Sequence, residues 1–93
     1  MWRSKPLPDV SKLKFTKHAI EKLEVMKHYG FEISKKQVIS TVLNPQTLNE
    51  RGGQYFAAKA INSKHALRVV FEKRKGYLLV ITFYPVKRDR YGI

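Results

Sequence analysis

The side chains best suited to chemistry in this sequence are one histidine and several cations near predicted strands. His18 is close to the start of a predicted helix. Lys59 and Arg68 lie on consecutive predicted strands, and Arg88 and Arg90 follow the last strand. Because an antiparallel meander places consecutive strands side by side, these groups can meet on one concave face.

Cleavage of RNA without a metal ion is the reaction that such a set would suit. In that reaction the ribose 2′-hydroxyl attacks the adjacent phosphate, so the site needs a base, an acid and cations. Histidine transfers protons near neutral pH, and a helix N-terminus favours the neutral imidazole of His18. The planar fork of Arg68 can bind two phosphate oxygens at once. The alternatives are a structural role for His18 and an ordinary solvated position for Arg68.

Further contacts to RNA are predicted from the basic turn and from aromatic residues near the end of the chain. Lys73, Arg74 and Lys75 would add positive charge, with a solvated turn as the alternative. Tyr84 and Tyr91 could stack on unpaired bases, a contact worth about 1–3 kcal/mol each. Burial within the sheet is the alternative for both tyrosines.

The net charge favours a polyanionic partner. Nineteen Lys and Arg face seven Asp and Glu, which gives a formal charge of +12. Self-repulsion at this charge destabilises the compact state, and RNA or a ribosome would relieve it. A membrane surface is disfavoured, because neither predicted helix combines a basic face with a strongly apolar one.

The composition predicts neither a metal nor a cofactor. The chain has no cysteine, so disulfides and thiolate metal sites are excluded. Its three histidines, at positions 18, 28 and 65, do not have the spacing of metal ligands. No segment has the roughly 18 apolar residues of a membrane span, and no apolar run follows Met1 as in a signal peptide. We therefore expect a cytoplasmic protein.

Two helices are predicted in the first half of the chain. Thr16 can cap a helix that runs to about Tyr29, with Gly30 at the position after its end. The apolar face of this helix is predicted from the spacing of Ala19, Ile20, Leu23, Met26 and Tyr29. Ser34 and Gln37 form a capping box for a second helix, flanked by the apolar pair Ile33 and Val38. Asn44 and Pro45 end that helix.

Four strands are predicted after Pro45, over residues 47–51, 55–61, 66–72 and 77–84. Gly52 and Gly53 suit a tight turn between the first two strands. Pro85 is expected to end the last strand, which leaves residues 86–93 as a basic tail. The expected fold is α+β, with two N-terminal helices packed on one face of a four-stranded antiparallel meander. It would form one domain over residues 15–93, after a flexible arm over residues 1–14.

The second half of the sequence resembles the RelE-type toxins. The resemblance rests on residues 67–72, on the apolar run 77–81 after a short turn, and on the basic segment 87–90. The first half, with residues 15–19 and the later Asn44 and Pro45, is similar to a poorly characterised relative of that superfamily, which also includes the BrnT-type and ParE branches. The resemblance implies two helices on an antiparallel sheet and metal-independent cleavage of messenger RNA.

The resemblance also assigns residue roles and partners. Lys59 falls at the catalytic lysine of RelE-type enzymes, Arg68 at their first arginine and Arg88 at their second. Ile61 replaces a lysine found in some members, and Tyr84 or Tyr91 would have to replace a catalytic tyrosine. The implied function is an mRNA interferase toxin held by an acidic antitoxin. The alternatives are a non-catalytic RNA- or ribosome-binding module, an inhibitor of a DNA enzyme, and a purely protein-binding domain.

Overall fold

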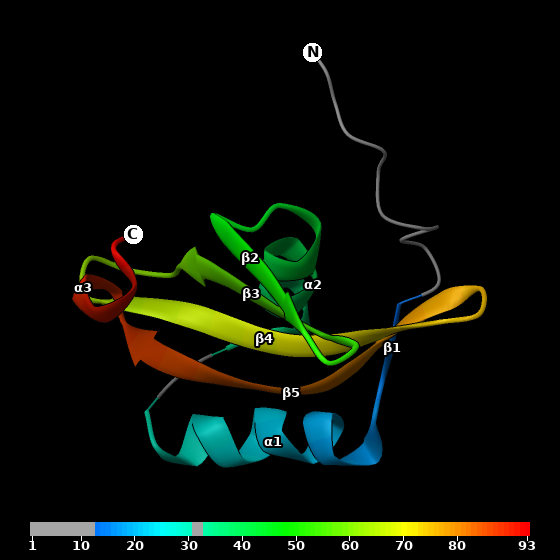
Figure 1. Cartoon of the computed structure of the whole chain (residues 1–93). Coiled ribbons are helices and arrows are strands. Elements are labelled where there is room, and N and C mark those ends of the chain that lie inside the picture. Colours follow the sequence, from blue (N-terminus) through cyan, green and yellow to red (C-terminus); the bar gives the residue numbers. More distant parts are fainter. Residues whose placement is uncertain (1–12, 31–32) are drawn as a thin grey trace.

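A computed structural model describes residues 13–30 and 33–93 as one α+β fold (Figure 1). Its elements in chain order are β1 (Leu13–Phe15), α1 (Lys17–His28), α2 (Lys35–Leu43), β2 (Thr47–Arg51), β3 (Gln54–Ala60), β4 (His65–Arg74), β5 (Tyr77–Lys87) and α3 (Arg88–Tyr91). In Figure 1, α1 runs along β5, and α2 lies behind β3 and β4.

The sheet has five strands in the order β1-β5-β4-β3-β2. Strands β2 to β5 form the predicted antiparallel meander. The fifth strand was not predicted: Leu13, Lys14 and Phe15 pair in parallel with Leu78, Leu79 and Val80 of β5. The last two residues of the predicted arm are therefore part of the sheet. Residues 1–12 of that arm lie outside the described residues.

Helix α1 begins where its capping signal indicates. The Thr16 side chain accepts a hydrogen bond from the Ala19 amide, and Gly30 after the helix has a φ of 84°. Ala19 is buried, and Leu23 and Met26 pack beside it against the core, at i, i+4 and i+7. The predicted apolar face was wrong at two positions, because Ile20 is 41% and Tyr29 is 73% exposed.

The core lies between the two helices and one face of the sheet. The capping box of α2 is confirmed, with both hydrogen bonds between Ser34 and Gln37 present. Ile33 and Val38 are buried, as the predicted apolar pair requires. The alternation predicted for β4 also holds, since its core-facing residues are Leu67, Val69 and Phe71. The other buried apolar residues of the core are Ala19, Val42, Ala57, Leu78, Val80 and Phe83.

The last strand is longer than predicted. Pro85 does not end it, because β5 continues to Lys87 and Pro85 pairs with Leu67 of β4. Strand β1 pairs only with residues 78–80, so the second half of β5 has strand pairing on one side alone. A residue without an N–H is tolerated at such an edge. The predicted basic tail is also wrong: after β5 the chain forms the short helix α3.

A β-bulge in β5 decides which residues share a face. Val80 pairs with Phe71 and Thr82 pairs with Val70, so Ile81 is an extra residue opposite the β4 strand. The hydroxyl of Thr16 donates to the Ile81 carbonyl at 3.1 Å, which links the start of α1 to the bulge. Beyond the bulge the alternation is shifted by one residue. Thr82 and Tyr84 consequently lie on the sheet face opposite the core.

Candidate nucleic-acid interface

Arg68 lies on the face of the sheet opposite the core, paired with Ala58 on one side and Tyr84 on the other. Its guanidinium carbon is 4.9 Å from the ring centre of Phe56, 5.9 Å from that of Tyr84 and 5.3 Å from that of Tyr91. It also donates a 2.6 Å hydrogen bond to the Tyr91 hydroxyl. Aromatic faces attract a cation, so these rings fix the guanidinium on the sheet surface.

Two side chains of α1 reach the same face beside β5. Lys22 Nζ donates to Thr82 Oγ1 at 3.2 Å, and His18 Nε2 is 3.5 Å from that oxygen. Lys22 Nζ is also 5.5 Å from the ring centre of Tyr84, which Arg68 approaches from β4. We call His18, Lys22, Phe56, Arg68, Thr82, Tyr84 and Tyr91 the open-face cluster. It joins α1, β3, β4, β5 and α3.

Lys22 is the functional candidate that the sequence reasoning missed. It lies four residues after His18, and residues at i and i+4 share a helix face. That spacing was visible in the sequence, but the side of α1 that would meet the sheet edge was not. Burial lowers the pKa of Lys22, because desolvation disfavours its charged form. A lysine in this condition gives up its proton more readily.

The cluster carries positive charge without carboxylates paired to it. Among residues 13–30 and 33–93, the single ion pair joins Arg74 to Glu72, so neither Lys22 nor Arg68 has an acidic partner. A positively charged surface attracts anions. The aromatic rings beside the cations are suited to stacking on nucleic-acid bases. The arrangement therefore fits a single-stranded, phosphate-bearing ligand.

Lys59 does not join the open-face cluster. It pairs with Leu67, which points into the core, while its neighbour Ala58 pairs with Arg68. Successive side chains of a strand point to opposite faces, so Lys59 and Arg68 lie on different sides of the sheet. Lys59 Nζ donates instead to Ser40 Oγ of α2 at 2.7 Å. The structure thus separates two residues that the resemblance to RelE-type toxins would bring together.

Arg88 is held by backbone carbonyls at the end of the sheet. Its Nε donates to the Ile93 carbonyl at 2.9 Å. One terminal nitrogen donates to the Asn62 carbonyl at 3.2 Å and lies 3.4 Å from the Ser63 carbonyl. These bonds connect the chain after β5 to the turn between β3 and β4. Arg88 therefore has a structural role that sequence reasoning did not foresee.

We expect Arg88→Ala to destabilise the fold rather than impair RNA contact. Losing charged hydrogen bonds to backbone carbonyls should lower the free energy of unfolding by about 1–3 kcal/mol. Chemical denaturation would measure this change. Arg90→Ala is the matched control, because Arg90 is exposed on the same short helix. Equal denaturation midpoints for the two variants would contradict the structural role of Arg88.

The remaining predicted RNA contacts are distributed unevenly. Tyr84 and Tyr91 belong to the open-face cluster, and Arg90 is exposed next to Tyr91. The basic turn is distant, because Lys73 is five residues along β4 from Arg68, about 17 Å in an extended strand. Lys73 Nζ lies 5.5 Å from the ring centre of Tyr55, and Lys75 is exposed. The turn therefore adds charge at one end of the sheet.

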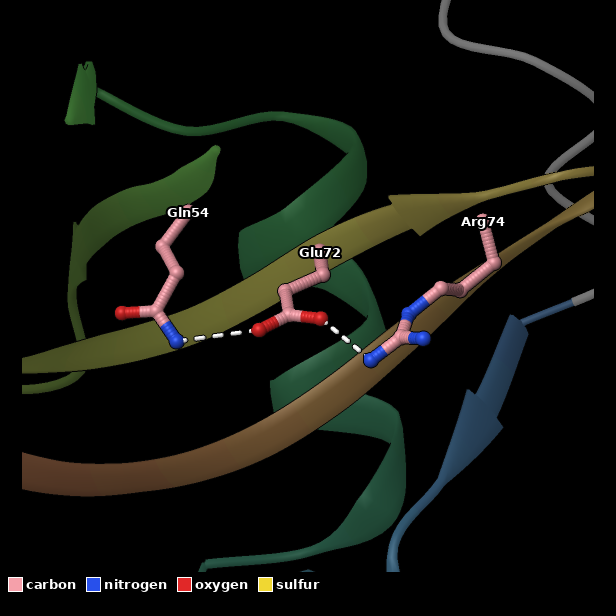
Figure 2. A network of polar contacts seen from close by, with 3 residues as sticks. All are labelled: Gln54, Glu72 and Arg74. Atoms are coloured by element: carbon pink, nitrogen blue, oxygen red, sulfur yellow. Dashed lines mark hydrogen bonds and ion pairs between the residues drawn. The ribbon is translucent and has the colours of Figure 1, made fainter. Parts of the chain in front are cut away.

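Arg74 belongs to a separate polar network on that distant part of the sheet. Figure 2 shows Gln54, Glu72 and Arg74 joined across β3 and β4. The hydrogen bond from Gln54 is the main cause that lowers the pKa of Glu72, and the charge of Arg74 adds to it. One terminal nitrogen of the Arg74 guanidinium is therefore occupied by the ion pair with Glu72.

In the part of the chain that the structure describes, no three His, Asp or Glu side chains are grouped as metal ligands would be. None of the described helices combines the length and apolar character needed to cross a membrane. Comparison with models of known protein families, with curated proteins and with solved structures gives no match.

Proposed function

We propose that this protein binds single-stranded RNA on the open-face cluster and cleaves it without a metal ion. The observation that carries the proposal is the meeting of His18 and Lys22 at Thr82, beside the Tyr84 ring that also lies near Arg68. A proton-transferring group and two cations are thereby gathered on one surface. The net charge of +12 supports a polyanionic substrate.

The chemistry assigns one task to each side chain. His18 takes the proton of the ribose 2′-hydroxyl, whose oxygen then attacks the adjacent phosphorus. Arg68 binds the phosphate oxygens as negative charge develops on them. Lys22, whose pKa is lowered by burial, donates a proton to the departing 5′-oxygen. The bond from phosphorus to that oxygen breaks, and the products are a 2′,3′-cyclic phosphate and a 5′-hydroxyl.

The decisive experiment is incubation of the purified protein with single-stranded RNA in the presence of EDTA. We expect cleavage to persist, a DNA strand of the same sequence to remain intact, and the 5′ fragment to end in a cyclic phosphate. Mass spectrometry of the fragments would identify that end group. Cleavage that requires magnesium would refute the mechanism, because the mechanism uses protein cations in place of a metal ion. Equal cleavage of DNA would also refute it, because DNA has no 2′-hydroxyl to act as the nucleophile.

A non-catalytic RNA-binding or ribosome-binding module is the second candidate. It is favoured by Lys59 and Arg88, whose side chains bond to Ser40 of α2 and to backbone carbonyls and not to members of the open-face cluster. Failure to cleave free or ribosome-bound RNA, combined with retained binding, would select this candidate. Binding in either case should weaken steeply between low and physiological salt, since protein cations displace counterions from the phosphates.

The biological role that we propose is that of a toxin in a toxin–antitoxin pair. An acidic antitoxin would be complementary to the charge of this chain and could cover the open-face cluster. Expression of the protein alone should then arrest growth in a suitable bacterial host, and a His18→Ala variant should not. Growth arrest that is equal for both proteins would instead favour a binding role.

A further inference from the structure

A hollow lies next to Arg68 on the side away from α1. It is lined by Asn49, Glu50, Arg51, Phe56 and Arg68 and has a volume of about 310 Å³. This volume is at the lower end of the range for small-ligand pockets, which is about 300–1,000 Å³. The open-face cluster and the hollow share Phe56 and Arg68. The two are therefore adjacent, and one ligand can contact both.

The strand register determines which side chains face this hollow. Asn49 pairs with Phe56, and Arg51 pairs with Gln54, across the β2–β3 ladder. Paired residues of an antiparallel ladder point to the same face, and Phe56 is on the face of Arg68 because their side chains are in contact. Asn49 and Arg51 therefore lie on the Arg68 face, at the edge of the sheet.

Both of these edge side chains have unused hydrogen-bonding groups. Within the described ranges 13–30 and 33–93, neither Asn49 nor Arg51 has a side-chain hydrogen bond or an ion pair. Asn49 offers an amide with one acceptor and a pair of donors, and Arg51 offers a planar fork of donors. Phe56 is partly exposed and supplies an apolar surface between them and Arg68.

We propose that this hollow binds a purine base of the RNA strand, next to the phosphate held by Arg68. The inference rests on the proposed function and adds a base preference to it. An asparagine amide pairs in a bidentate way with N6 and N7 of adenine, and an arginine fork pairs likewise with O6 and N7 of guanine. Pyrimidines have no N7, so they cannot form either pair. Unpaired RNA exposes these base edges to a protein.

The distances along the sheet suit a neighbouring nucleotide. Asn49 is two strands across and two residues along the sheet from Arg68, about 12 Å at the usual strand and residue spacings. The bound strand would therefore cross the sheet from α1 toward β2. Its reactive phosphate would lie at His18, Lys22 and Arg68, and its adjacent base would lie in the hollow.

The test uses the full-length protein and a series of oligouridine hexamers, each carrying one adenine or guanine at a different position. Binding is measured by fluorescence anisotropy, so the test does not depend on cleavage. We expect one purine position to tighten binding about ten-fold, the scale of one bidentate base contact. Asn49→Ala should remove the preference for adenine, and Arg51→Lys should weaken that for guanine, because lysine keeps the charge but lacks the planar fork of donors.

Binding of the all-uridine hexamer by both variants should equal that of the wild-type protein. Leu48→Ala is the matched control, since Leu48 is exposed on the same strand but faces the other way. RNA that binds with equal affinity whatever its bases would overturn the purine site and leave the proposed function standing. A purine preference that survives both substitutions would show that the base contact lies elsewhere, and it would also overturn the purine site in the hollow. Absence of any RNA binding would overturn both proposals.

Discussion

His18→Ala should lower the rate of RNA cleavage by about 10²–10⁴-fold, the usual contribution of a general base. Nothing else in the open-face cluster transfers protons near neutral pH as readily as an imidazole. Affinity for RNA should change little, because Lys22 and Arg68 still bind the phosphate. Single-turnover cleavage and anisotropy would measure the two quantities separately.

His28→Ala is the control for this experiment. His28 is exposed in the last turn of the same helix, away from Thr82, so its loss should leave the rate unchanged. A His18→Ala variant that cleaves at the wild-type rate would assign His18 a packing role only.

Arg68→Ala should reduce both binding and cleavage, with a loss of cleavage of about 10²–10³-fold if it stabilises the transition state. Its guanidinium is the cation that the rings of Phe56, Tyr84 and Tyr91 surround, so no neighbouring side chain can replace it. Arg68→Lys keeps the charge but not the bidentate fork, and we expect it to recover binding more than cleavage. Kd and single-turnover rates would be compared for both variants.

Lys36→Ala removes the same charge from an exposed position on α2 and serves as the control for non-specific electrostatics. Arg68→Ala also loses the hydrogen bond to Tyr91 and the contacts with three rings, so its thermal transition should fall modestly, and the variants are compared at a temperature well below all of their transitions. Equal losses of RNA affinity in Lys36→Ala and Arg68→Ala would show that Arg68 contributes only to the general field.

Local signals in the sequence predicted most of the secondary structure. Helix starts at Thr16 and Ser34 follow from side-chain capping, which involves residues three positions apart and is visible in a linear sequence. The β2 strand and the turn at Gly52 and Gly53 follow from strand alternation and from the positive φ that glycine tolerates. The face of β4 that bears Arg68 was predicted for the same reason.

These local signals did not predict pairing between strands that are far apart in the sequence. Strand β1 exists because residues 13–15 meet residues 78–80, a contact that no local pattern marks. Pro85 was expected to end β5 because the sequence does not show that this half of the strand lacks a neighbour on one side. The resemblance likewise could not show that Lys59 would face α2 while Arg68 faces the opposite side.

The sequence by itself determined the charge, the capped helices, the meander and the choice of His18 and Arg68 as candidates. Only the tertiary structure decided that these two residues share a surface, and the physical reason is the bulge at Ile81. One extra residue shifts the alternation of β5, so Thr82 and Tyr84 turn toward Arg68. Thr16 bonds to that bulge and brings α1 alongside, which places His18 and Lys22 against Thr82.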